Sequence, residues 1–218
     1  MQSTKTQSGF TLVEIAVVLV IIGLLLGGIL KGQELIENSR VKSAANDINA
    51  IRAAYAGYID RYKRLPGDDG TVTTLRARGG SWAGITAAGN QDGVIAADVA
   101  NLNSPPTGER LAFFQHLRAA GFLSGNPATT GTAALPRNPW GGFVNIVNDT
   151  NQGRTGARLQ VCLGNVPGKA AVALDSTLDD GRPDGGTLRA SAGGNDPGAA
   201  PPNDGYKEDQ TYAICVDM

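Results

Sequence analysis

Few side chains in this sequence have the type and spacing that enzyme chemistry requires. His116 is the only histidine among 218 residues, and Phe113, Phe114 and Leu117 lie close to it. We therefore expect a packed or helix-surface histidine rather than a catalytic one. The sequence contains no G-x-S-x-G, phosphate-binding loop, H-E-x-x-H or paired C-x-x-C motif. One histidine and two distant cysteines also make zinc improbable, so the sequence predicts a protein that is not an enzyme.

Two acidic, glycine-rich stretches offer oxygen ligands for a cation. The first stretch contains Asp68, Asp69, Asn90 and Asp92, and the second contains Asp175, Asp179, Asp180 and Asp184. Calcium takes six to eight oxygens from carboxylates, amides and carbonyls on flexible loops, and either stretch provides part of such a set. Neither stretch matches the EF-hand pattern, and Asp-Gly and Asn-Gly dipeptides also form turns without a metal. Calcium and simple turns therefore both remain open.

Glu14 is a carboxylate within an apolar segment. Residues 1–9 are polar, and residues 10–30 read FTLVEIAVVLVIIGLLLGGIL, with Glu14 as their only charge. Twenty-one helical residues span about 31 Å, which matches the hydrocarbon core of a bilayer. A secretory signal has a shorter apolar core, and its small-residue cleavage site follows that core instead of preceding it. The segment predicts a single-pass membrane helix, but a plain anchor does not need Glu14, because a carboxylate inside a membrane is costly.

The residues Gly9-Phe10-Thr11-Leu12-Val13-Glu14 resemble the processing site of type IV prepilins and type II secretion pseudopilins. The resemblance implies that a prepilin peptidase cuts after Gly9 and methylates the new N-terminus at Phe10. It also implies that Glu14 pairs with the N-terminal ammonium of a neighbouring subunit during assembly, since two charges in a low-dielectric bundle offset each other when they are adjacent. The alternative is an interfacial Glu14 that reaches the lipid headgroups.

Beyond the membrane segment, apolar residues spaced three and four apart predict an amphipathic helix. They are Val41, Ala44, Ile48, Ile51, Tyr55, Tyr58, Tyr62 and Leu65. Pro66 and Gly67 should end this helix, so we expect one continuous helix over residues 11–64. The stripe is little longer than three heptads and ends in tyrosines, which favours packing against the chain's own head over a coiled-coil dimer.

The remaining sequence predicts a small head domain. Residues 65–108 are rich in turn formers and predict no regular element, whereas residues 109–123 predict a short amphipathic helix that ends at Gly121. Strand patterns occur at residues 143–147, 158–163 and 211–216. Together these elements predict a pilin-like α+β fold, in which the long helix covers one face of a small antiparallel sheet. The expected organisation is a leader peptide at residues 1–9, a transmembrane and assembly helix at 10–30, an amphipathic spine helix at 31–64 and a globular head at 65–218.

The two cysteines, Cys162 and Cys215, lie in the second and third predicted strands. A head outside the cytoplasm would place them in an oxidising compartment, where a disulfide persists. Closing a loop of about 50 residues would contribute roughly 4 kcal/mol in a chain-entropy model. A disulfide is favoured over two free buried thiols, and its position resembles the bridge that fastens the C-terminal region of many pilins.

The resemblance implies a structural subunit of a type IV pilus or a type II secretion-type pseudopilus. Its implied partners are prepilin peptidase, an inner-membrane assembly platform, membrane lipid, and other pilins in a homo- or hetero-polymer. The chain would be a single-pass inner-membrane protein with a periplasmic head before assembly, and part of a pilus or pseudopilus afterwards. The alternative is a membrane-anchored minor pilin or adhesin-like protein whose head recognises a ligand.

The balance of charge and the resemblance bear on two further ligands. The net charge of −1, from 19 basic and 20 acidic residues, predicts no nucleic-acid partner. Major pseudopilins of type II secretion hold a C-terminal loop with calcium. By analogy of role, the resemblance favours the second acidic stretch as a calcium site over the first.

Overall fold

The computed structural model describes residues 9, 11–98 and 100–218. The chain divides into two compact units, residues 1–39 and residues 40–218, and each is described by itself. Most of the predicted leader peptide and Phe10 lie outside the described residues.

Helix α1 (Leu12–Tyr62) is continuous over 51 residues, as the apolar patterns predict. In the second unit its predicted stripe faces inward: Val41, Ala44, Ile48, Ile51 and Tyr58 are buried, and the other stripe residues are partly buried. The helix ends at Tyr62, slightly before the predicted position. The reason is that Lys63 adopts a left-handed backbone conformation, with φ of 55°, which closes the last turn before Pro66.

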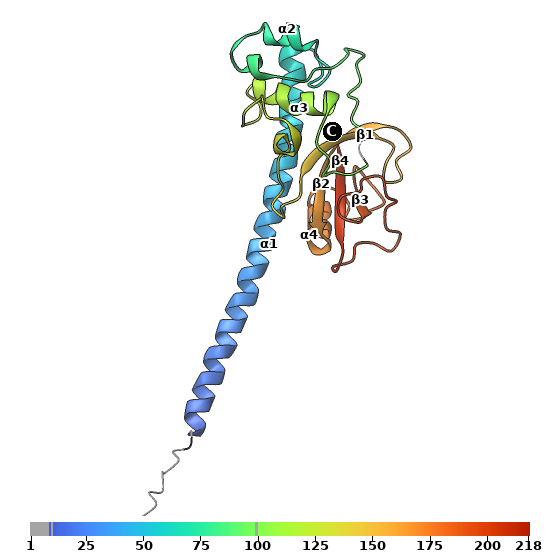
Figure 1. Ribbon diagram of the computed structural model, residues 1–218. Coiled ribbons are helices and arrows are strands. Elements are labelled where there is room, and N and C mark those ends of the chain that lie inside the picture. The colour runs from blue at the N-terminus through green and yellow to red at the C-terminus, as the bar shows by residue number, and fades with distance from the viewer. Residues whose placement is uncertain (1–8, 10, 99) are drawn as a thin grey trace, which may run out of the picture. The chain divides into compact units, whose positions relative to one another are not determined.

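The head contains a four-stranded antiparallel sheet, which together with the long helix confirms the predicted α+β fold (Figure 1). Its strands are β1 (Val144–Asp149), β2 (Arg158–Pro167), β3 (Leu188–Ala192) and β4 (Thr211–Asp217), in the order β1-β2-β4-β3. Strands β1, β2 and β4 correspond to the three predicted strands. Strand β3 was not predicted, because its sequence LRASA has little β-branched or aromatic character.

Alternate residues of each strand point to opposite faces of the sheet. One face contributes to the main core through Val144, Ile146, Val161, Leu163, Leu188, Ala190, Tyr212, Ile214 and Val216. Residues 41–58 of α1 supply buried side chains to the same core, as the stripe predicts. The opposite face carries a smaller cluster of Val147, Cys162, Ala213 and Cys215, which is joined by Leu102.

Several short helices complete the head: α2 (Val72–Arg76), the 3-10 helix η1 (Gly80–Gly84), α3 (Gly108–Ala119), the 3-10 helix η2 (Gly131–Ala134) and α4 (Gly168–Leu178). Helix α3 confirms the helix predicted at residues 109–123, although it ends at Ala119, and it is buried on nearly all sides rather than amphipathic. Helices α2 and η1 occupy the region where no element was predicted. Helix α4 was also not predicted, and it begins where a side chain cannot fit: a Cβ on Gly168 would lie 1.8 Å from the Lys207 carbonyl oxygen.

His116 is a packed residue within an aromatic cluster. Its side chain is fully buried beside Tyr58 and Trp82. Nδ1 accepts a hydrogen bond from the Gly67 amide at 3.0 Å, and Nε2 lies 3.3 Å from the Ala87 carbonyl oxygen. Burial lowers the pKa of His116 to about 4. The neutral imidazole therefore acts here as a bridge between two loops.

We expect His116 to make the head less stable as the pH falls below neutrality. Its pKa is about 4 in the folded protein and about 6.5 in an unfolded chain. The unfolded state therefore binds more protons between these values, and stability is lost as the pH drops from about 6.5 toward 4. At pH 5 the loss attributable to His116 is about 2 kcal/mol. Urea unfolding of residues 40–218 at pH 7.5 and pH 5 measures it.

His116→Gln is the control for this experiment, since a glutamine oxygen still accepts the Gly67 amide proton but does not titrate. The difference between wild type and variant isolates the histidine from other titrating groups. An equal loss of stability in both proteins between pH 7.5 and pH 5 would show that His116 does not carry the effect.

Candidate functional site

Glu14 closes a capping box at the start of α1. Its Oε2 atom accepts hydrogen bonds from the backbone amide and the hydroxyl of Thr11, both at 2.8 Å, and the Glu14 amide donates to the Thr11 hydroxyl at 3.2 Å. This reciprocal pair satisfies two of the amides that the first turn of a helix leaves without partners. This role is not among those predicted from the sequence, although Thr11-x-x-Glu14 has the S/T-x-x-E signature of a capping box.

The following part of α1 exposes a continuous apolar surface. Each Val, Leu and Ile side chain from residue 12 to residue 30 is at least 46% exposed. Among the described residues, α1 is the one helix that is long and apolar enough to cross a membrane. A surface of this size is far larger than the apolar patches that soluble monomers tolerate. It requires a lipid bilayer or other apolar helices around it.

The comparisons with known proteins identify this N-terminal segment. Residues 4–30 match the family described as the prokaryotic N-terminal methylation motif. This match supports a type IV pilin- or pseudopilin-like prepilin, and the long helix followed by a small antiparallel sheet is a pilin-like α+β architecture. The comparison with curated proteins gives no match. The class of the chain thus rests on its N-terminal motif and its fold.

The residues predicted for processing and assembly are placed only in part. Gly9 is exposed, and a Cβ built on it would meet no atom within 4 Å. Phe10, the predicted site of methylation, lies outside the described residues. Glu14 lies in the first turn of α1 and is held by Thr11 as described above.

Cys162 and Cys215 form a disulfide, as predicted. They are direct partners in the antiparallel register of β2 and β4, and both are fully buried. The bridge lies on the face of the sheet opposite the main core and closes a segment with a sequence separation of 53. In a chain-entropy model this closure contributes about 4 kcal/mol. The disulfide joins β2 and β4, the two central strands of the sheet.

The second acidic stretch brings three of its four predicted residues together. Each of Asp175, Asp179 and Asp180 can place one carboxylate oxygen within 4.8 Å of the others. Asp184 does not join them, because its carboxylate binds the Arg182 guanidinium at 3.3 Å. The predicted group of four is therefore a group of three, and helix α4 supplies the buried Asp175 that the sequence analysis placed in a loop.

Burial raises the pKa of Asp175 to about 6, and the negative charges of Asp180 and Asp179 add to the increase. Its two oxygens accept hydrogen bonds from the Tyr206 hydroxyl at 2.5 Å and the Gly181 amide at 3.0 Å. These bonds favour the carboxylate form but do not balance its burial. The cluster thus concentrates negative charge beside a helix C-terminus, where carboxylates are disfavoured.

Hydrogen bonds within the protein account for the first acidic stretch. The Asp68 carboxylate accepts hydrogen bonds from the backbone amides of Gln91 and Gly93. These bonds fasten the loop that contains Gln91 and Gly93 to Asp68. Asp69 accepts the Tyr58 hydroxyl at 2.7 Å and pairs with Arg78 at 2.9 Å. These carboxylates hold turns and a buried tyrosine, which agrees with the turn interpretation.

Proposed function

We propose that the mature chain is a structural subunit of a type IV pilus or a type II secretion-type pseudopilus. A peptidase removes the leader after Gly9, Phe10 becomes the methylated N-terminus, and α1 mediates polymerisation. The observation that carries this proposal is the match to the methylation motif over residues 4–30, a segment whose Val, Leu and Ile side chains from residue 12 to residue 30 are exposed. An apolar helix of this length fits the membrane before assembly and a bundle of like helices after it.

The proposed organisation assigns one task to each segment. Residues 1–9 are the leader, residues 10–30 the membrane and assembly helix, residues 31–64 the spine, and residues 65–218 the head. The partners are prepilin peptidase, an inner-membrane assembly platform, lipid and other pilins. The Cys162–Cys215 disulfide supports a periplasmic head, because disulfides are rare in the cytoplasm.

Glu14 has two roles in this proposal. In the membrane it caps α1 through Thr11. In the filament its carboxylate pairs with the ammonium of Phe10 from a neighbouring subunit, which avoids two isolated charges in an apolar bundle. The first role needs only a hydrogen-bond acceptor, whereas the second needs a negative charge.

Isolation of filaments tests polymerisation directly. Filaments sheared from cells that express the chain with a complete assembly machinery should contain it in its processed form. A chain that is processed but stays entirely in the inner membrane would instead be an anchored binding protein, and polymerisation would be wrong.

We also propose that Asp175, Asp179 and Asp180 hold a calcium ion. Three carboxylates suit a hard divalent cation, and each offers one oxygen to the group, which supplies three of the six to eight oxygens that calcium takes. Burial is the main cause of the raised pKa of Asp175, and the charge of the ion would offset both this burial and the repulsion from Asp180 and Asp179. Asp179 also accepts the Leu188 amide at 2.8 Å, so the ion would stiffen the connection between α4 and β3.

We expect 1 mM calcium to raise the Tm of residues 40–218 by about 3 °C or more relative to EDTA. When 1 mM calcium is at least ten times the Kd, binding adds about 1.4 kcal/mol or more to the free energy of unfolding. Each kcal/mol shifts the Tm of a head of this size by about 2–4 °C. Asp180→Asn should remove the shift, whereas the matched control Asp184→Asn should retain it. Equal Tm values in calcium and in EDTA would rule out the site.

A further inference from the structure

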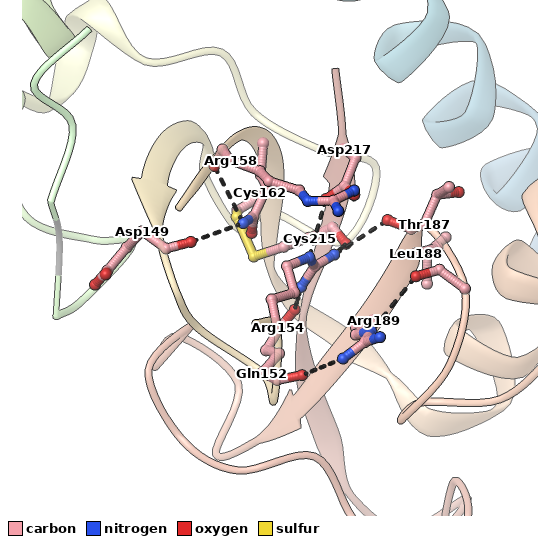
Figure 2. Close-up of polar contacts among 12 residues, drawn as sticks. Asp149, Gln152, Arg154, Arg158, Cys162, Thr187, Leu188, Arg189, Cys215 and Asp217 are labelled. Atoms are coloured by element: carbon pink, nitrogen blue, oxygen red, sulfur yellow. Dashed lines mark hydrogen bonds and ion pairs between the residues drawn. A yellow bond between two sulfur atoms is a disulfide. The ribbon is translucent and has the colours of Figure 1, made fainter. Parts of the chain in front are cut away.

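A small polar pocket lies on the face of the sheet that carries the disulfide. Its volume is about 190 Å³, and it is lined by Arg154, Thr155, Arg158, Gly186, Arg189 and Asp217. Three of these residues are arginines and one is an acid (Figure 2). The pocket is smaller than the roughly 300–1,000 Å³ of sites for drug-sized ligands. It therefore suits a small ion or the charged end of a larger molecule.

The strand register gathers these side chains. Arg158 on β2, Arg189 on β3 and Asp217 on β4 occupy positions that point to the same face as the disulfide, because alternate residues share a face. Arg154 comes from the loop between β1 and β2, and Figure 2 shows it beside Asp217 and the disulfide. Residues that are far apart in the sequence thus meet around one pocket.

Arg154 is a fixed cation within this group. Its Nε donates to Asp217 Oδ1 at 2.9 Å, and Nη1 donates to the Gln152 side-chain oxygen at 2.9 Å. Its Nη2 donates to the carbonyl oxygens of Thr187 and Cys215, at 3.1 and 3.0 Å. The side chain is only 3% exposed, so these two side chains and two carbonyl groups hold the guanidinium in one position.

The charges around the pocket do not balance. The single carboxylate of Asp217 forms an ion pair with both Arg154 and Arg158. The Nη1 atom of Arg158 lies 3.3 Å from Asp217 Oδ2. Arg189 donates to the carbonyl oxygens of Gln152 and Gly186, which carry no net charge. The lining therefore holds three positive charges against one negative charge. Burial lowers the pKa of Arg154, Asp217 opposes this effect, and the repulsion from Arg189 and Arg158 adds a smaller decrease.

We propose that this pocket binds a phosphate-class oxyanion, either free or as the end of a larger molecule. An excess of two positive charges matches a dianion, and guanidinium groups form paired hydrogen bonds with phosphate oxygens. Arg158, with 61% of its side chain exposed, and the partly buried Arg189 are the ligands that approach from solvent. Arg154 supplies a fixed charge behind them, and Thr155 lies in the same lining.

Titration of the full chain in non-ionic detergent tests the proposal, with ³¹P line broadening or calorimetry as the readout. Inorganic phosphate should bind, and raising the sodium chloride concentration should weaken it. Arg158→Gln and Arg189→Gln should each weaken binding by about tenfold, since each removes charged hydrogen bonds. The matched control Arg64→Gln alters an exposed arginine outside the pocket and should leave the affinity unchanged.

A second arm separates the sources of the phosphate. Glycerol phosphate and a short-chain phosphatidylglycerol are titrated beside inorganic phosphate. Tighter binding of the lipid than of phosphate would support the pocket and assign it to a lipid headgroup, whereas equal affinities would support it as a site for free phosphate. The proposal fails if phosphate does not bind, or if Arg158→Gln and Arg189→Gln bind it as well as Arg64→Gln does. Arg158 is exposed, so a folding defect should not confuse the result.

Discussion

We expect Glu14→Gln to leave processing intact and to reduce incorporation into filaments by at least tenfold. Glutamine retains the acceptor oxygen that the capping box requires, so the start of α1 should be preserved. The substitution removes the negative charge, however, and the ammonium of a neighbouring subunit would then lie unpaired in an apolar bundle. An unpaired charge inside a membrane costs several kcal/mol, and each 1.4 kcal/mol is a tenfold change in an equilibrium. Immunoblots of sheared filaments and of membranes measure the distribution of the chain.

Thr11→Val is the control that isolates the cap. It removes the hydroxyl that makes two of the three hydrogen bonds with Glu14 and leaves the charge in place. Loss of such a cap costs about 1 kcal/mol of helix stability. We expect nearly normal incorporation, because the rest of α1 is continuous. If Glu14→Gln assembles normally while Thr11→Val does not, Glu14 serves as a helix cap and its proposed role in assembly is wrong.

The second large effect is expected at Gly9. Gly9→Val should abolish cleavage, so that the chain keeps its leader, stays in the membrane and does not enter filaments. The residue is exposed, and a Cβ there would meet nothing within 4 Å. The substitution therefore leaves the chain's own packing undisturbed, and its effect must arise where the peptidase binds the cleavage site. The mass of the chain from cells with active prepilin peptidase shows whether residues 1–9 are present.

Gly23→Val provides a matched control for this experiment. Gly23 lies within the apolar part of α1, and a Cβ there also meets no other atom within 4 Å. The same change in side chain should therefore leave cleavage intact. Normal cleavage of Gly9→Val would move the processing site elsewhere in the chain.

The sequence was most informative where a pattern is local and continuous. The apolar run after Gly9 is unbroken, the stripe from Val41 to Leu65 keeps one helical period, and both predict α1 correctly. Strands β1, β2 and β4 contain runs of Val, Ile, Leu or Tyr that favour the extended conformation. The pairing of Cys162 with Cys215 follows from there being only two cysteines.

Other parts of the head could not be predicted because their signals are weak or nonlocal. Helix α4 begins at Gly168, directly after Pro167, and has no side-chain cap, so its start lacks the usual marker. Strand β3 is stabilised by its antiparallel pairing with β4 rather than by the strand preference of its own residues. The arginine pocket draws on residues from 154 to 217, and only the sheet brings them together. Asp184 was grouped with the other acids by its proximity in sequence, whereas in the fold it pairs with Arg182.

The N-terminus of the mature chain tests the central claim most directly. The chain is purified from the membranes and filaments of cells with active prepilin peptidase, and its N-terminal peptide is identified by mass spectrometry. Our account predicts that the chain begins at Phe10 and that this residue carries an N-methyl group. A chain that still begins at Met1, or one that is cut at a site other than the Gly9–Phe10 bond, would contradict the account.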